Sequence, residues 1–305
     1  MQTQPLSRRR FLGVLAATLL LAGCSEDKKS LRESRIGLAL GAGGAKGLAH
    51  TVIFEALDEL AIRPHVIAGT SMGAIMGAMY ASGLSGSDIR ALINKYVVTD
   101  EDTWSDALLN KDILRWTEII DPELGRGGLL SGDGFIRVLQ DNIKSETFAD
   151  LKIPLKVVAA DLRSSEEHVF DKGPLKPALQ ASIAIPGIFS PVIYNHTAYV
   201  DGSTVNPVPY DLLLDECDIT IAVDVSGSMT PDDDDSPSYF DTIFTSLGIM
   251  QEAIMREKLK QRPPDIYLRP DIRDIRLLEF YAAESIFRQA EPVKKRLRQQ
   301  LRRFA

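Results

Sequence analysis

Ser71 is the residue whose neighbours best suit it to nucleophilic chemistry. It lies in the segment Gly69 to Gly73, which has the G-x-S-x-G pattern of serine hydrolases. The apolar residues before this segment predict a short strand, and the small residues after it predict a helix. Such a strand-to-helix turn exposes the serine hydroxyl beside the positive end of the helix dipole. The alternative interpretation of the pattern is an ordinary tight glycine turn.

A second glycine-rich segment, Gly41 to Gly47, could stabilise negative charge. It does not match the dinucleotide fingerprint, because Lys46 stands where the third glycine is required, and no G-K-[ST] sequence closes it as a phosphate loop. Successive N–H groups at the start of a helix suit a developing oxyanion. We therefore expect an oxyanion hole built from Gly41, Gly43 and Gly44, with added positive potential from Lys46.

The histidines are poorly placed to accept the proton of Ser71. The chain has four of them, and a surface or packing role is the favoured interpretation of each: His50, His65, His168 and His196. Ser71, Asp161 and His196 do follow one another in the order of an α/β-hydrolase triad. However, Gly47 precedes Ser71 with room for only one helix and one strand, which argues against that layout.

Asp201 is the other candidate base. It ends a predicted strand and is followed by Gly202, so its carboxylate could approach a neighbouring loop closely. Burial would raise its pKa enough for it to accept a proton near neutral pH. An Asp-Gly turn without a catalytic role is the alternative interpretation.

Four segments of the chain together resemble the patatin-like phospholipase family. Residues 42–47 are similar to its oxyanion glycine motif, residues 69–73 to its nucleophile elbow, and residues 201–202 to its D-G-[GA] motif. Residues 181–191 are similar to the A-S-x-A-x-P-x-x-F-x-P stretch of bacterial members. The chain has Ala42 where the glycine motif usually begins with glycine, and Ser203 where glycine or alanine is usual. The resemblance covers about residues 36 to 210.

The resemblance implies both a fold and an activity. The fold is a three-layer α/β/α sandwich with a mostly parallel central sheet. The activity is hydrolysis of lipid acyl esters, of the phospholipase A, lysophospholipase or esterase type, in lipid catabolism or membrane remodelling. It implies a dyad of Ser71 as nucleophile and Asp201 as proton acceptor, with no metal or cofactor. A lipid-binding protein that kept the fold without activity is the rival interpretation.

The first residues have the pattern of an export signal. Ser7 to Gly13 resembles a twin-arginine signal, an apolar run follows, and Leu21 to Cys24 resembles the lipobox of bacterial lipoproteins. We expect cleavage before Cys24 and lipidation of its thiol. The alternatives are an uncleaved apolar anchor or a cysteine that lies near the signal by chance. Residues 1–23 would then be the signal peptide, 24–34 a tether and 35–305 the patatin-like domain, anchored to a membrane of the bacterial cell envelope, facing the periplasm or in the outer membrane.

Composition limits the partners. The formal net charge of −7 disfavours nucleic acid as a partner. The chain has two cysteines, so acylation of Cys24 would leave Cys217 without a disulfide partner, and we expect Cys217 to be a small buried residue. The sequence does not indicate an oligomeric state.

The predicted elements alternate between strands and helices, which favours a mostly parallel sheet covered by helices in one compact domain. Ser87 is the expected N-cap of the helix at 88–97, and Pro292 is expected to break the last helix. Strands are predicted at 35–40, 66–68, 155–161, 168–170, 198–200, 219–225 and 266–268, and helices at 48–62, 72–80, 88–97, 104–120, 132–143, 179–185, 239–260 and 285–304.

Overall fold

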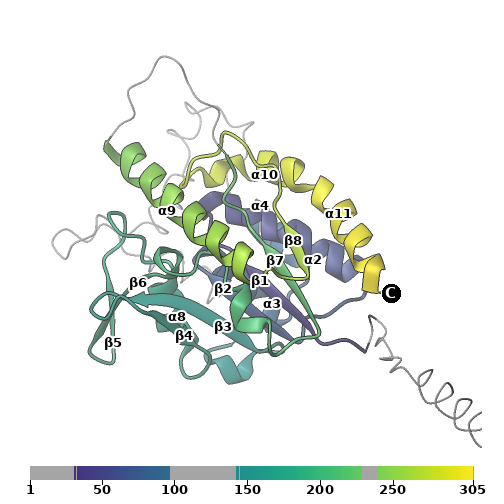
Figure 1. The fold of residues 1–305 in the computed structure, drawn as a ribbon, viewed down its shortest axis with the longest axis horizontal. Helices are drawn as coiled ribbons and strands as arrows, with labels where there is room; N and C mark the ends of the chain where they lie inside the picture. Colours follow the sequence, from purple (N-terminus) through teal and green to yellow (C-terminus); the bar gives the residue numbers. More distant parts are fainter. Residues whose placement is uncertain (1–30, 32, 97–141, 144, 229–238, 305) are drawn as a thin grey trace, which may run out of the picture.

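The structure, a computed structural model, describes residues 31, 33–96, 142–143, 145–228 and 239–304 (Figure 1). The signal sequence, Cys24 and the helix predicted at 104–120 lie outside these residues, as does nearly all of the helix predicted at 132–143. No helix within the described ranges is long and apolar enough to cross a membrane.

The described residues form one sheet with the strand order β5-β6-β3-β2-β1-β7-β8, and β4 also pairs with β3. Five neighbouring strands of this order, β3, β2, β1, β7 and β8, run parallel to one another. The strands β4 and β6 pair antiparallel with β3, and β5 pairs antiparallel with β6. The strands are β1 (Ile36–Leu40), β2 (Val66–Thr70), β3 (Leu155–Asp161), β4 (Glu167–Phe170), β5 (Val192–Tyr194), β6 (Thr197–Asp201), β7 (Ile219–Val223) and β8 (Ile266–Leu268).

Helices cover both faces of this sheet, and alternation along β1 shows which residues face which layer. Leu38 and Leu40 belong to the larger core, formed with α2, α3, α4, α8, α10 and α11, whereas Ala39 faces η4 and α9. The described helices are η1 (Gly44–Ala49), α2 (His50–Glu59), α3 (Met72–Ser82), α4 (Gly86–Tyr96), η2 (Phe148–Asp150), α8 (Leu175–Ser182), η3 (Gly202–Thr204), η4 (Tyr210–Leu213), α9 (Tyr239–Gln261), η5 (Phe280–Ala282), α10 (Ala283–Ala290), α11 (Pro292–Leu301) and η6 (Arg302–Phe304). The predicted three-layer α/β/α sandwich is confirmed.

The register of the sheet brings the two predicted catalytic residues to the same level. Thr70, the last residue of β2, pairs with Val158 of β3, and Ser71 follows it. Asp201, the last residue of β6, pairs with Ala159, the next residue of β3, on the same edge as β2, because β4 pairs along the other edge. The end of β2 and the end of β6 therefore meet along one edge of β3, which places Ser71 next to Asp201.

Several element boundaries differ from the prediction. The helix α8 begins at Leu175 rather than residue 179, because Pro177 lies in its first turn, where a missing N–H costs no helical bond. The strand β5 was not predicted. It forms a hairpin with β6 through Asn195 and His196, which both have positive φ, as a two-residue hairpin turn requires. The break at Pro292 is confirmed.

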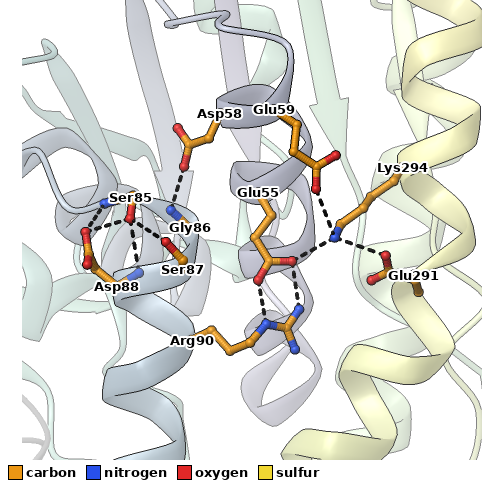
Figure 2. A network of polar contacts seen from close by, with 10 residues as sticks. All are labelled: Glu55, Asp58, Glu59, Ser85, Gly86, Ser87, Asp88, Arg90, Glu291 and Lys294. Carbon is orange, nitrogen blue, oxygen red and sulfur yellow. Dashed lines mark hydrogen bonds and ion pairs between the residues drawn. The ribbon is translucent and has the colours of Figure 1, made fainter.

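The N-cap of α4 also differs from the prediction, as Figure 2 shows. Ser85 Oγ accepts a hydrogen bond from the Asp88 N–H at 3.1 Å, and the Asp88 carboxylate accepts one from the Ser85 N–H at 2.9 Å. Ser85, rather than Ser87, therefore caps this helix, because the helix starts at Gly86.

Candidate active site

The G-x-S-x-G segment forms a sharp turn between β2 and α3. Ser71 has φ 55° and ψ −125°, a conformation that costs energy for a residue with a side chain and is typical of strained functional turns. A Cβ atom on Gly73 would lie 2.1 Å from the Leu40 carbonyl oxygen, and one on Gly69 would lie 2.6 Å from Ala74 Cα. Only glycine fits at these two positions, so the turn packs directly against the end of β1.

Ser71 and Asp201 are in direct contact. The Ser71 hydroxyl donates a hydrogen bond to Asp201 Oδ2 at 2.6 Å, and the Ser203 N–H donates to Asp201 Oδ1 at 2.8 Å. Both side chains are buried, with Ser71 4% and Asp201 1% exposed. Both carboxylate oxygens are thus oriented, one toward the nucleophile and one toward the backbone of η3.

The environment of Asp201 favours its neutral form more than water does. Burial raises the pKa of Asp201 to about 6, although hydrogen bonds from Ser71 and Ser203 act in the opposite direction. Within the described residues, no cation contributes to this shift. A carboxylate with a pKa near neutrality can both take a proton and return it.

Gly202 allows the Asp201 strand to approach β3 closely. A Cβ atom at this position would lie 2.4 Å from the Val158 carbonyl oxygen. Any larger residue would push Asp201 away from β3 and so from Ser71. The glycine of the D-G pair is therefore part of the geometry of the dyad.

The glycine loop after β1 has two kinds of N–H group. The Gly41 N–H donates to Val223 O at 2.9 Å and the Ala42 N–H to Pro207 O at 2.9 Å, so neither is free. The prediction that Gly41 contributes a donor to the oxyanion hole is therefore wrong. Among the described residues, the N–H groups of Gly43 and Gly44 have no hydrogen-bond partner, so these two can serve as donors.

The same loop packs on the elbow. A Cβ atom on Gly47 would lie 2.3 Å from Met72 Cγ, and Met72 is the residue directly after the nucleophile. Gly44 has φ +54°, and a Cβ there would lie 2.3 Å from Leu277 O. The start of η1 is thus held between the elbow and the loop before η5.

Lys46 lies in a partly buried, charged environment beyond this loop. Burial lowers the pKa of its ammonium group, nearby Asp224 and Glu279 raise it, and Arg269 lowers it further. The backbone N–H of Lys46 donates to the Gly43 carbonyl oxygen at 3.1 Å. Lys46 can therefore add positive potential near the loop.

The structure does not assemble the alternative triad. The Asp161 carboxylate accepts a hydrogen bond from the Arg163 N–H at 2.8 Å, within its own turn. His196 is exposed in the turn that precedes β6, whereas Asp201 ends that strand. The Asp161 carboxylate is thus engaged within its own turn, and no hydrogen bond between described residues joins His196 to Ser71.

His50 has a role that sequence reasoning missed. It is fully buried, and its Nε2 donates to the Gly41 carbonyl oxygen at 2.9 Å, because a carbonyl can only accept. Burial lowers the pKa of His50 to about 4, so it is neutral at pH 7. It orients the glycine loop, and its position one turn into the helix after that loop was the available signal.

Cys217 lies just before β7, partly buried rather than fully enclosed. Its Sγ atom would lie 2.8 Å from a Cβ on Gly37, so it packs against β1. Burial raises the pKa of its thiol, which favours the protonated form. It acts as a packing residue.

Comparisons with known proteins find relatives of this chain. The chain is 33% identical over 195 residues to an uncharacterised NTE family protein of Mycobacterium tuberculosis, covering 64% of this chain and 50% of that protein. It is 31% identical over 216 residues to patatin-like phospholipase domain-containing protein 7 of Rattus norvegicus, covering 70% of this chain and 15% of that protein.

A third relative is lysophospholipase NTE1 of Kluyveromyces lactis, 26% identical over 286 residues, which cover 85% of this chain and 19% of that protein. The chain thus spans half or less of the length of these relatives. The family model described as patatin-like phospholipase matches residues 38–214, which include Ser71, Asp201 and the glycine loop. Since this match covers more than half of the sequence, the chain belongs to the patatin-like phospholipase family.

Proposed function

We propose that this protein hydrolyses acyl esters of lipids with a dyad of Ser71 and Asp201. The observation that carries the proposal is the 2.6 Å hydrogen bond between the buried Ser71 hydroxyl and a carboxylate whose pKa is raised to about 6. Family membership and the lysophospholipase among the relatives support a lipid ester as the substrate class.

In the acylation step, Ser71 Oγ attacks the ester carbonyl carbon while its proton passes to Asp201 Oδ2. The carbonyl oxygen becomes an oxyanion, which the Gly43 and Gly44 N–H groups stabilise. The tetrahedral intermediate then collapses, and the leaving alcohol takes the proton from Asp201. The products of this step are an acylated Ser71 and a free alcohol, for example a lysolipid.

In the second step, water attacks the acylated Ser71 and Asp201 accepts a proton from it. The same two N–H groups stabilise the second oxyanion. Collapse of this intermediate releases a fatty acid and returns the proton to Ser71. One carboxylate therefore serves both steps, which requires its pKa to lie close to the working pH.

The test is covalent labelling of the protein with a fluorophosphonate at pH 7.5. We expect one adduct, located on Ser71 by mass spectrometry, and none in Ser71→Ala. The matched control is Ser190→Ala, which removes a serine hydroxyl that has no hydrogen-bond partner in the described residues. Labelling that persists in Ser71→Ala would contradict the proposal.

The substrate class is tested with short-chain esters, lysophospholipids and phospholipids, each measured beside Ser71→Ala. Hydrolysis of at least one lipid ester by the parent chain alone is the expected result. A folded parent chain that hydrolyses none of them would favour the rival interpretation, a lipid-binding protein without activity.

We propose in addition that the protein is a lipoprotein of the bacterial cell envelope, anchored through Cys24. The support is the order of twin arginines, apolar run and lipobox in residues 7–24. Growth of a bacterial expression host with an alkyne fatty acid should label the parent chain and leave Cys24→Ser unlabelled. Equal labelling of the two would contradict this anchor.

A further inference from the structure

The hydroxyl group of Ser182 lies between the backbone of the nucleophile and β3, the strand with which both β2 and β6 pair. The Ser71 N–H donates to Ser182 Oγ at 2.9 Å, and the Ser182 hydroxyl donates to the Val158 carbonyl oxygen at 2.6 Å. The side chain of Ser182 is 0% exposed. This hydroxyl therefore joins the backbone of the nucleophile to β3 through two buried hydrogen bonds.

The register of β2 and β3 shows what this hydroxyl replaces. Ile67, which pairs with Leu155, donates its N–H to the Pro154 carbonyl oxygen. The same step four residues along would join the Ser71 N–H to Val158 O. In the structure the Ser182 oxygen stands between these two groups and satisfies both. The regular hydrogen bonding between β2 and β3 is thus interrupted by the Ser182 oxygen at the start of the turn that carries Ser71.

The same turn of the chain also holds the base. The Asp201 N–H donates to the Ala184 carbonyl oxygen at 2.9 Å, and Ala184 comes two residues after Ser182, beyond the end of α8. Both members of the dyad are therefore held by their backbone N–H groups from one short segment. Residues 181–191, which resemble a family motif, therefore also have a structural role in this site.

We propose that Ser182 is a positioning residue that fixes the backbone of Ser71 so that its hydroxyl meets the Asp201 carboxylate. The inference rests on the proposed function. Without the Ser182 hydroxyl, the Ser71 N–H either stays unpaired in a buried site or moves to bond Val158 O directly. Either change displaces the nucleophile relative to Asp201, and a displacement of about 1 Å can cost roughly 100-fold in rate.

The experiment compares Ser182→Ala with Ser190→Ala. The second variant removes a hydroxyl without a hydrogen-bond partner in the described residues, from the same segment, residues 181–191. For Ser182→Ala we expect kcat on a soluble short-chain ester to fall roughly 10- to 100-fold, with KM nearly unchanged. The rate of fluorophosphonate labelling should fall by the same factor. Ser190→Ala should keep both values. Circular dichroism of each variant establishes that it is folded.

A second pair, Ser182→Thr and Ser182→Val, separates the hydroxyl from the shape of the side chain. The two replacements have similar volume, and only threonine can bridge Ser71 and Val158. Activity should be higher in Ser182→Thr, and this comparison decides the matter if Ser182→Ala does not fold. Equal activity of this pair, or a loss in Ser182→Ala confined to KM, would overturn the inference.

Failure of the proposed function gives a different result. A parent chain that hydrolyses no ester and takes no label overturns the proposed function, and this inference with it. An active parent chain with an equally active, folded Ser182→Ala overturns the role of Ser182 alone.

Discussion

Two partly or fully buried carboxylates of this protein, Asp201 and Glu55, differ in their partners. Asp201 accepts hydrogen bonds from a hydroxyl and an amide, whereas Glu55 accepts from the Arg90 guanidinium at 2.5 and 2.8 Å and lies 2.9 Å from Lys294 Nζ (Figure 2). The Glu55 cluster joins α2, α4 and α11 on the side of the sheet that carries the larger core.

The partners decide the direction in which each pKa moves. Burial alone would raise the pKa of both groups. For Glu55, hydrogen bonds from Arg90 and Lys294 outweigh burial and hold the pKa below its ordinary value. For Asp201, burial dominates and the pKa rises to about 6. The two cations suit Glu55 to joining helices. No cation among the described residues lowers the pKa of Asp201, which suits that residue to proton transfer.

Asp201→Asn should have the largest effect. Asparagine can keep the contact with Ser71 but cannot accept its proton, so kcat should fall by about 10²- to 10⁴-fold. The measurement is steady-state hydrolysis of a short-chain ester, with His196→Gln as the control that should stay active. Loss of activity in the histidine variant alone would restore the triad and contradict the dyad.

The same variant should change the pH dependence of stability. Because folding raises the pKa of Asp201 from 3.8 to about 6, the stabilisation from this group is complete below pH 4 and is lost as the pH rises through 6. The stability of Asp201→Asn relative to the parent should therefore increase over this range, by up to roughly 3 kcal/mol. Chemical denaturation at pH 4, 5, 6 and 7 measures the difference, and a constant difference would contradict the raised pKa.

The next largest effect is the loss of activity on the acid side of the pH–rate profile. The base must be ionised, so kcat/KM should fall about tenfold per pH unit below about 6 and level off above it. A neutral ester makes the measurement independent of substrate ionisation. His50, whose pKa is lowered to about 4, cannot produce a limb at this pH. A limb at pH 4 or below would show that Asp201 is not the titrating base.

Glu55→Gln should have the smallest effect and should act on stability alone. It removes the charge that Arg90 and Lys294 share, and we expect a loss of roughly 1–2 kcal/mol in unfolding free energy at pH 7. The pKa of Glu55 is lowered by folding, so this contribution is present above the ordinary pKa and is lost as the pH falls through the folded value. Denaturation of parent and variant from pH 7 to pH 3 should show the difference shrink, with kcat at pH 7 unchanged.

The local patterns of the sequence predicted much of the fold. Apolar runs and glycines located β1, β2 and β3, and small residues after Ser71 located α3, because these features act on the backbone within a few residues. Short elements with weaker signals were missed or shortened, such as β5 and the first turn of α8. Their stability depends on pairing with β6 and on packing against the sheet.

By itself, the sequence determined which residues are equipped for the chemistry: a serine in a glycine turn, an aspartate before a glycine, and a glycine loop after a strand. Only the tertiary structure decided how they meet. The strands β2 and β6 pair with successive stretches of one edge of β3, which brings Ser71 and Asp201 together, and the Gly41 N–H donates to Val223 O. Ser182 gains its contact with Ser71 from 111 residues away. Such contacts depend on strand order and packing between distant segments, which local sequence patterns do not record.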